Sequence, residues 1–185
     1  MKNVYLWASS IVICCLVGCA GEPMQEGGVG EAVQRLATAE DIEHACSHAQ
    51  SPPGGAYTNV TAVTSGTAPL LVEHGAYNVT LPGSGSSYAG KVAFEADEDA
   101  EHAFYTDPSV TVTVKLGTTV LTPVWSTTLT AEVCAGSNNT SLPDYGTDAA
   151  LSYVKTYDLE SGETYSVEFT NTSAALLVIP ENLEE

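Results

Sequence analysis

Val110-Thr-Val-Thr-Val-Lys115 alternates apolar and polar residues with a period of two, which is typical of a strand with one buried face. Similar short runs rich in Thr, Val, Tyr and Phe occur from Tyr57 onward, separated by Gly, Pro, Asn, Asp and Ser. No long helical pattern interrupts them. We therefore expect a mainly β domain over 57–181, an antiparallel, jelly-roll-like β-sandwich with one short N-terminal helix. The predicted strands are 58–63, 69–73, 77–81, 91–96, 102–105, 110–116, 120–124, 130–134, 154–159, 164–169 and 175–179.

The helix is expected within residues 37–51. Thr38 can cap its first turn, and Asp41 stands three residues later, at the capping-box position. The helix should end near Gln50, because Pro52-Pro-Gly-Gly55 cannot continue it. A narrow apolar stripe at helical spacing is expected to face the domain, and it consists of Ile42, Ala45, Cys46 and Ala49.

The chain is strongly acidic. It has 185 residues, with 5 Lys and Arg against 23 Asp and Glu, and a formal net charge of −18. Nucleic-acid binding needs clustered cations and is excluded as a function. Charged residues make up only 15 % of the chain and hydrophobic residues 44 %, so a core can form and the acidity belongs to the surface. Such a surface favours solubility and attracts cations.

The N-terminus has the pattern of a secretory signal over residues 1–18. Lys2 precedes an apolar run that is too short to span a bilayer. Leu16-Val17-Gly18-Cys19 resembles the lipobox of bacterial lipoproteins. The resemblance implies an acylated Cys19 and anchoring in the cell envelope, with outer-membrane sorting on the periplasmic or surface side. Residues 19–36 are rich in Gly and Glu and show no period, so we expect a flexible acidic tether there. The alternative is an ordinary signal sequence in which Cys19 occurs by chance.

Cys46 and Cys134 are the cysteines that remain after the signal sequence and the lipidated position. An oxidising compartment favours a disulfide between them. Separate free or metal-bound thiols are the alternative.

Three segments carry a second resemblance, namely Lys91-Val-Ala-Phe-Glu-Ala96, Ser109-Val-Thr-Val-Thr-Val114 and 157–169. Together they are similar to the bacterial pre-peptidase C-terminal-like β-sandwich domains. This resemblance implies a non-catalytic accessory module. Some members of that family are associated with calcium or polysaccharide. The aspartate-rich strand of that family is replaced here by Val112-Thr-Val-Lys115, so a calcium site is not carried over.

His44 and His48 are four residues apart, so a helix places both imidazoles on one face. We expect them on the solvent side, away from the apolar stripe. Such a pair can chelate Zn²⁺, Cu²⁺ or Ni²⁺ with neighbouring carboxylates completing the ligand set. His74 and His102 are further candidates if the fold brings them to the helix. The alternative interpretation is that His44 and His48 are surface residues of an acidic helix.

No catalytic motif stands out. The chain lacks H-E-x-x-H, C-x-x-C, G-x-x-x-x-G-K and G-x-G-x-x-G. We therefore expect a non-enzymatic, lipid-anchored envelope lipoprotein that presents a β-sandwich to an unidentified protein or polysaccharide partner. A Zn²⁺- or Cu²⁺-binding lipoprotein is the first alternative. A polysaccharide-binding accessory domain is the second, with Trp125 either a stacking platform or a core residue.

Overall fold

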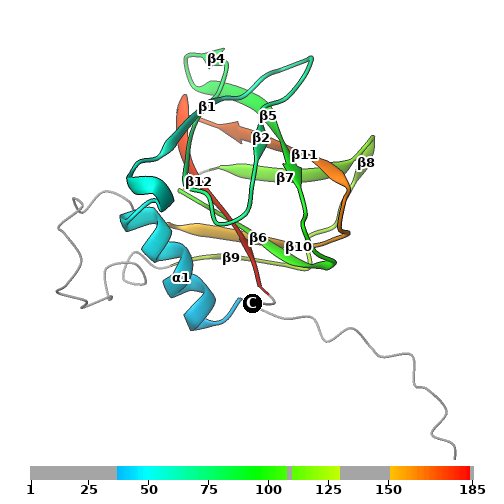
Figure 1. Ribbon diagram of the computed structural model, residues 1–185. Coiled ribbons are helices and arrows are strands. Elements are labelled where there is room, and N and C mark those ends of the chain that lie inside the picture. Colours follow the sequence, from blue (N-terminus) through cyan, green and yellow to red (C-terminus); the bar gives the residue numbers. More distant parts are fainter. Residues whose placement is uncertain (1–36, 108–109, 130–150, 184–185) are drawn as a thin grey trace, which may run out of the picture. The chain divides into compact units, whose positions relative to one another are not determined.

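A computed structural model describes residues 37–107, 110–129 and 151–183 (Figure 1). These residues belong to one compact unit, Gln34–Glu185. The predicted signal sequence and tether, Cys19, Cys134 and the strand predicted at 130–134 lie outside the described residues. Within the described ranges, no helix has both the length and the apolar character needed to cross a membrane.

The described residues form one α-helix, a short 3-10 helix and twelve strands. The helices are α1 (Ala39–Gln50) and η1 (Pro53–Gly55). The strands are β1 (Thr58–Thr61), β2 (Leu70–Leu71), β3 (Tyr77–Thr80), β4 (Gly83–Ser84), β5 (Ser87–Glu95), β6 (Ala100–Thr106), β7 (Thr111–Leu116), β8 (Thr119–Val120), β9 (Trp125–Thr128), β10 (Tyr153–Leu159), β11 (Thr164–Asn171) and β12 (Ala175–Asn182).

The strands form two sheets, which confirms the predicted β-sandwich. Sheet A has the order β1-β3-β12-β6-β10-β9, and sheet B has the order β2-β5-β11-β7-β8 with β4 paired to β5. Most pairs are antiparallel, but β1–β3 and β2–β5 are parallel, so both sheets are mixed. Along the chain, β2 of sheet B lies between β1 and β3, and β3 of sheet A lies between β2 and β5, so the strands of each parallel pair are separated by a crossing to the other sheet. Each crossing lets the next strand of a sheet run in the same direction as the last.

The main core lies between the inner faces of the two sheets. Val112 and Val114 of β7 are fully buried there, as the period of two predicts. Phe94 and Phe104 join the sheets by an edge-to-face contact, with ring centroids 5.1 Å apart.

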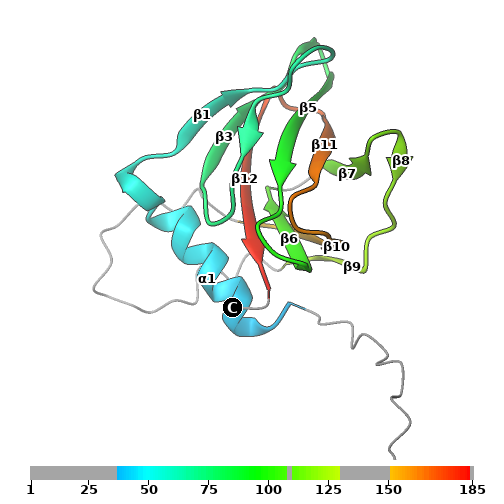
Figure 2. The ribbon, with the colours of Figure 1, turned by 45° about the vertical axis from the view of Figure 1, so that its right-hand side comes forward.

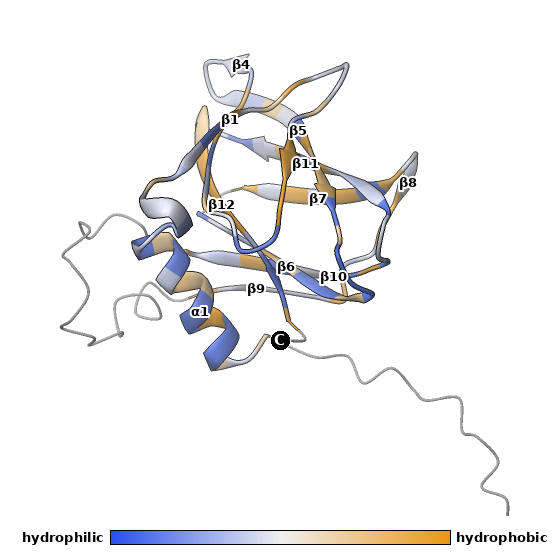
Figure 3. Cartoon of the chain, in the orientation of Figure 1, coloured by the Kyte–Doolittle hydropathy of each residue, from blue (hydrophilic) through white to orange (hydrophobic). Residues whose placement is uncertain are grey.

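A second apolar cluster covers the outer face of sheet A, where α1 packs. Ala45, Cys46 and Ala49 of the predicted stripe are buried against residues such as Tyr105 and Ile179. Both ribbon views place α1 alongside the end of β12 (Figures 1 and 2). Figure 3 shows apolar residues along the strands, whereas α1 carries both hydrophilic and hydrophobic ones. The centre of sheet A is therefore buried on both faces.

The start of α1 is as predicted. The Thr38 backbone N–H donates to Asp41 Oδ2 at 2.7 Å, and the Asp41 N–H donates to Thr38 Oγ1 at 3.2 Å, which completes a capping box. Cys46 is buried and disulfide-bonded, and its partner lies outside the described residues. Its pairing with Cys134 stays a prediction.

Several strand limits differ from the prediction, and β4 and β9 lie where no strand is predicted. Strand β5, for example, begins at Ser87, four residues before the predicted start at 91. The strand expected at 120–124 ends at Val120, and β9 begins only at Trp125, because Pro123 lacks the N–H that a ladder needs. Trp125 is partly buried against the second cluster, which favours its interpretation as a core residue. At the other end of the domain, β12 continues to Asn182, three residues beyond the predicted limit at Ile179.

Candidate metal centre

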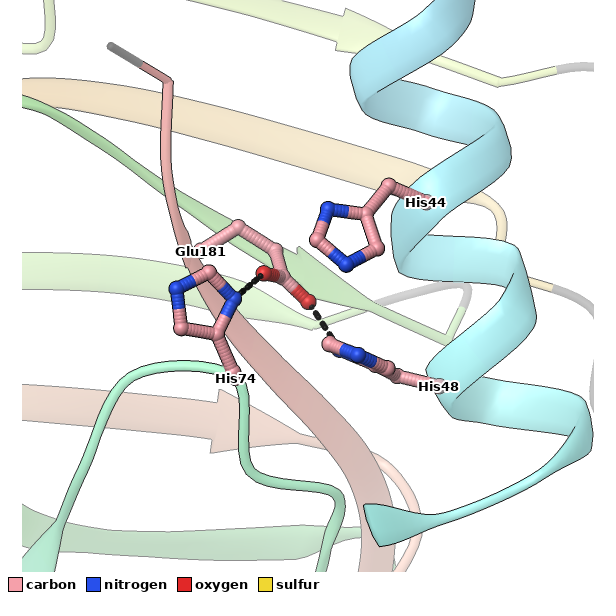
Figure 4. A group of neighbouring side chains, drawn as sticks. All are labelled: His44, His48, His74 and Glu181. Carbon is pink, nitrogen blue, oxygen red and sulfur yellow. Dashed lines mark hydrogen bonds and ion pairs between the residues drawn. The ribbon is translucent and has the colours of Figure 1, made fainter. Parts of the chain in front are cut away.

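Four side chains converge beside the outer face of sheet A, next to the contact between α1 and β12. They are His44, His48, His74 and Glu181, and each offers one donor atom within 4.8 Å of the others (Figure 4). The residues come from three segments that are far apart in the chain. Their meeting is therefore a product of the tertiary fold.

Helix α1 supplies the first two ligands. One helical turn separates His44 from His48, and their ring centroids lie 4.5 Å apart. The expectation that both face solvent is wrong for His48, whose side chain is only 15 % exposed. His44 is exposed as expected. The difference arises because the packed face of α1 is wider than its apolar stripe and includes the position of His48 beside β12.

Glu181 is the buried member of the group. It lies on β12 opposite Ala103 of β6, and its side chain is 3 % exposed. A carboxylate buried to this degree requires partners. His48 Nδ1 lies at hydrogen-bond distance, 2.6 Å from Oε1, and His74 Nδ1 lies 2.6 Å from Oε2. The second contact is an ion pair without hydrogen-bond geometry, so Oε2 remains able to accept a further ligand.

His74 reaches this position from the loop between β2 and β3. Its backbone N–H donates to the carbonyl of Pro180 at 2.9 Å. The pairing of β3 with β12 ends at Tyr77 and Val178, so the loop takes over the place of β3 beside β12. This also explains how a proline is tolerated in β12, since its missing N–H would face a position where β3 no longer pairs.

His102 is not part of the group. It is fully buried in β6, where Nε2 lies 2.7 Å from Glu73 Oε1 and Nδ1 lies 2.9 Å from the Ala100 carbonyl. Successive residues of a strand face opposite sides, and its neighbour Ala103 is the residue that lies beside Glu181. His102 therefore belongs to the opposite face of sheet A, and its prediction as a metal ligand is wrong for this geometry.

The surroundings of the group are desolvated and negative. Burial raises the pKa of the Tyr105 hydroxyl above its ordinary value, and the charges of Asp41 and Glu181 raise it further. Both effects disfavour another negative charge under α1. A cation in the same place would be favoured by the same field.

Three imidazoles and one carboxylate form a donor set that suits Zn²⁺ and Cu²⁺. Calcium and magnesium ions prefer oxygen ligands and fit this set poorly. Donor atoms around a tetrahedral zinc ion lie about 3.3 Å apart, given Zn–N bonds of about 2.0–2.1 Å. A 2.6 Å contact between two donor atoms that both bind the ion would have to open by roughly 0.7 Å on that estimate, a movement within reach of side-chain rotation. In Figure 4 the second ring nitrogen of His74 is directed away from the other three residues, so His74 would ligate through Nδ1.

Sequence reasoning missed Glu181 among the 23 carboxylates of the chain. A signal was present in the alternation of Ile179, Glu181 and Leu183, which share one face if the strand continues past Ile179. A carboxylate between two apolar residues on one strand face indicates a buried charge.

No protein-family model matches the chain, and no curated protein matches it either. The resemblances to bacterial lipoproteins and to pre-peptidase C-terminal-like domains stay predictions.

Proposed function

We propose that this domain binds one ion of a first-row transition metal, Zn²⁺ or Cu²⁺, through His44, His48, His74 and Glu181. The observation that carries the proposal is the convergence of four donors from a helix, a loop and a strand around a buried carboxylate.

The balance of charge supports a cation. The two histidines that contact Glu181 offset its negative charge when they carry protons, and a divalent ion would offset it more strongly at closer range. The net charge of −18 raises the concentration of cations near the surface as a whole. Metal binding is therefore favoured both locally and by the long-range field.

The exposure of the ligands supports exchange of the ion with solvent. His44 is exposed and the side chain of His74 is 31 % exposed, whereas Glu181 lies beneath them. An ion held by these residues would have one side facing water. This arrangement suits a protein that takes up, buffers or passes on a metal ion.

The proposal is compatible with the predicted lipid anchor at Cys19. A metal-binding domain on an acidic tether would hold Zn²⁺ or Cu²⁺ at the cell envelope. The anchor, the envelope location and the absence of catalytic activity stay proposals beside the metal site.

Calorimetric titration of the purified protein with Zn²⁺ and with Cu²⁺ tests the proposed function. We expect one ion per chain. Glu181→Gln, which keeps the shape of the side chain but removes its charge, and His48→Ala should each weaken binding at least about tenfold, or 1.4 kcal/mol. Glu43→Gln is the matched control, because it removes an exposed charge next to His44 and should leave affinity within about twofold.

Equal affinities for the unaltered protein and Glu181→Gln would contradict the proposed site. If the unaltered protein binds neither ion with a Kd in the micromolar range or lower, the proposed function itself is contradicted.

A further inference from the structure

We infer that Tyr77 and His102 are positioning residues of the metal centre, which hold the loop Val72–Tyr77 in the conformation that places His74 beside Glu181. This inference rests on the proposed function and concerns residues outside the ligand set. It gives a role to the buried His102 and to Tyr77, neither of which belongs to the group of four donor residues.

Tyr77 closes the loop at both ends. Its hydroxyl accepts a hydrogen bond from the Val72 N–H at 2.9 Å and donates one to the Val72 carbonyl at 3.2 Å. The backbone of Gly75 lies directly on the tyrosine ring, since a Cβ added at Gly75 would overlap the ring at Cε2. The ring therefore supports the middle of the loop while the hydroxyl joins its ends.

The buried pair of Glu73 and His102 holds the residue before His74. The Ala100 carbonyl can only accept, so the His102 Nδ1 carries a proton, and Nε2 faces Glu73 Oε1 at 2.7 Å. The same carboxylate oxygen accepts the Asp97 N–H at 3.2 Å. Glu73 is thus anchored to β6 and to the turn that precedes it, and the anchor is well shielded because His102 is fully buried.

His74 itself adopts a backbone conformation that a non-glycine residue rarely takes. Its φ is +54°, and among the described non-glycine residues it is the one with a positive φ. Strained conformations of this kind persist when neighbouring contacts over-determine them, and they gather at ligand sites. The contacts of Glu73, Gly75 and Tyr77 surround His74 on both sides and supply that constraint. If these contacts are lost, a smaller fraction of molecules has His74 in the position that binds the metal. The apparent metal affinity then falls in proportion to that fraction.

The chain contains a matched control for Tyr77. Tyr165 closes the turn that begins at Glu160 in the same way, with its hydroxyl accepting from the Glu160 N–H at 2.7 Å and donating to the Glu160 carbonyl at 3.3 Å. That turn links β10 to β11 and carries no member of the metal group. Tyr165→Phe therefore removes an equivalent pair of hydrogen bonds from a place that should not influence the metal.

The experiment is calorimetric titration of the purified variants with Zn²⁺, with a thermal melt of each to confirm folding. Tyr77→Phe should weaken Zn²⁺ binding about threefold to tenfold, and His102→Gln about tenfold, because each loosens the loop that places His74. Tyr165→Phe should bind Zn²⁺ like the unaltered protein. In a His74→Ala background, Tyr77→Phe and His102→Gln should cause no further loss, because both act through His74.

Equal Zn²⁺ affinities for Tyr77→Phe and Tyr165→Phe would overturn the inference. So would a loss from Tyr77→Phe that persists undiminished in the His74→Ala background, since that pattern means a general structural effect. If His102→Gln does not fold, the comparison of Tyr77→Phe with Tyr165→Phe tests the inference by itself. The proposed function survives a failure of this inference if the unaltered protein binds Zn²⁺ and His48→Ala weakens that binding. If the unaltered protein binds no Zn²⁺, the inference and the proposed function are both overturned.

Discussion

Glu181 and His74 occupy positions that their residue types disfavour. Glu181 places a carboxylate under a helix, where an unpaired charge would be costly. His74 places a side chain on a left-handed backbone that favours glycine. The charge of Glu181 is met by its contacts with His48 and His74. The backbone of His74 is held by the contacts of its loop neighbours Glu73, Gly75 and Tyr77. Residues that accept such costs together indicate a site whose function requires them.

The backbone of His74 allows a stability test that is independent of metal. We expect His74→Gly to be more stable than His74→Ala by about 1 kcal/mol, because glycine adopts a positive φ without the clash that Cβ causes. Urea unfolding of both variants in the presence of a chelator measures the difference.

The control for this comparison is the pair Glu43→Gly and Glu43→Ala at an exposed position inside α1. There the order should reverse, with alanine more stable by about 1 kcal/mol. If His74→Ala proves at least as stable as His74→Gly, the loop does not hold the left-handed backbone.

At the scale of elements, α1 is the part of the domain that local rules describe best. Its capping box, its end near Gln50 and its buried stripe could all be predicted, because each depends on residues within a few positions of one another. The limit at Asn182 was harder to predict, because its pairing partner His102 lies far along the chain. The limit at Val120 has a local cause in Pro123, which the strand prediction did not take into account.

Thr38→Ala should lower the free energy of unfolding by about 1 kcal/mol, because it removes the side chain that accepts the Asp41 N–H. Chemical denaturation measures the loss. Thr61→Ala, on the exposed edge strand β1, is the control and should change stability by less than about 0.5 kcal/mol. Similar losses for the two variants would mean that α1 does not depend on its cap.

At the scale of the whole domain, the proposed metal ion would join the first helix to the last strand through a loop between them. A ligand that binds only the folded state stabilises it in proportion to its binding. The proposed site would therefore link metal occupancy to the docking of α1 on sheet A.

Free Zn²⁺ at 100 times its dissociation constant should stabilise the domain by about 2.7 kcal/mol. For a domain of this size we expect a rise in Tm of about 5–10 °C. Differential scanning calorimetry with and without Zn²⁺ measures the shift. Glu181→Gln should show little of it, and Ca²⁺ should not reproduce it. An equal shift for Glu181→Gln would place the bound ion elsewhere.

The sequence by itself determined what depends on near neighbours, namely the β-rich texture, the capped helix and the adjacency of His44 and His48. Those features follow from periods of 2 and 3.6 residues and from capping chemistry. Only the tertiary structure decided that His74 and Glu181 join the pair and that His102 does not. The physical reason is that these placements depend on the crossing of the chain between sheets and on the register of β12 against β3 and β6. A shift of that register by one residue would turn Glu181 to the opposite face of the sheet.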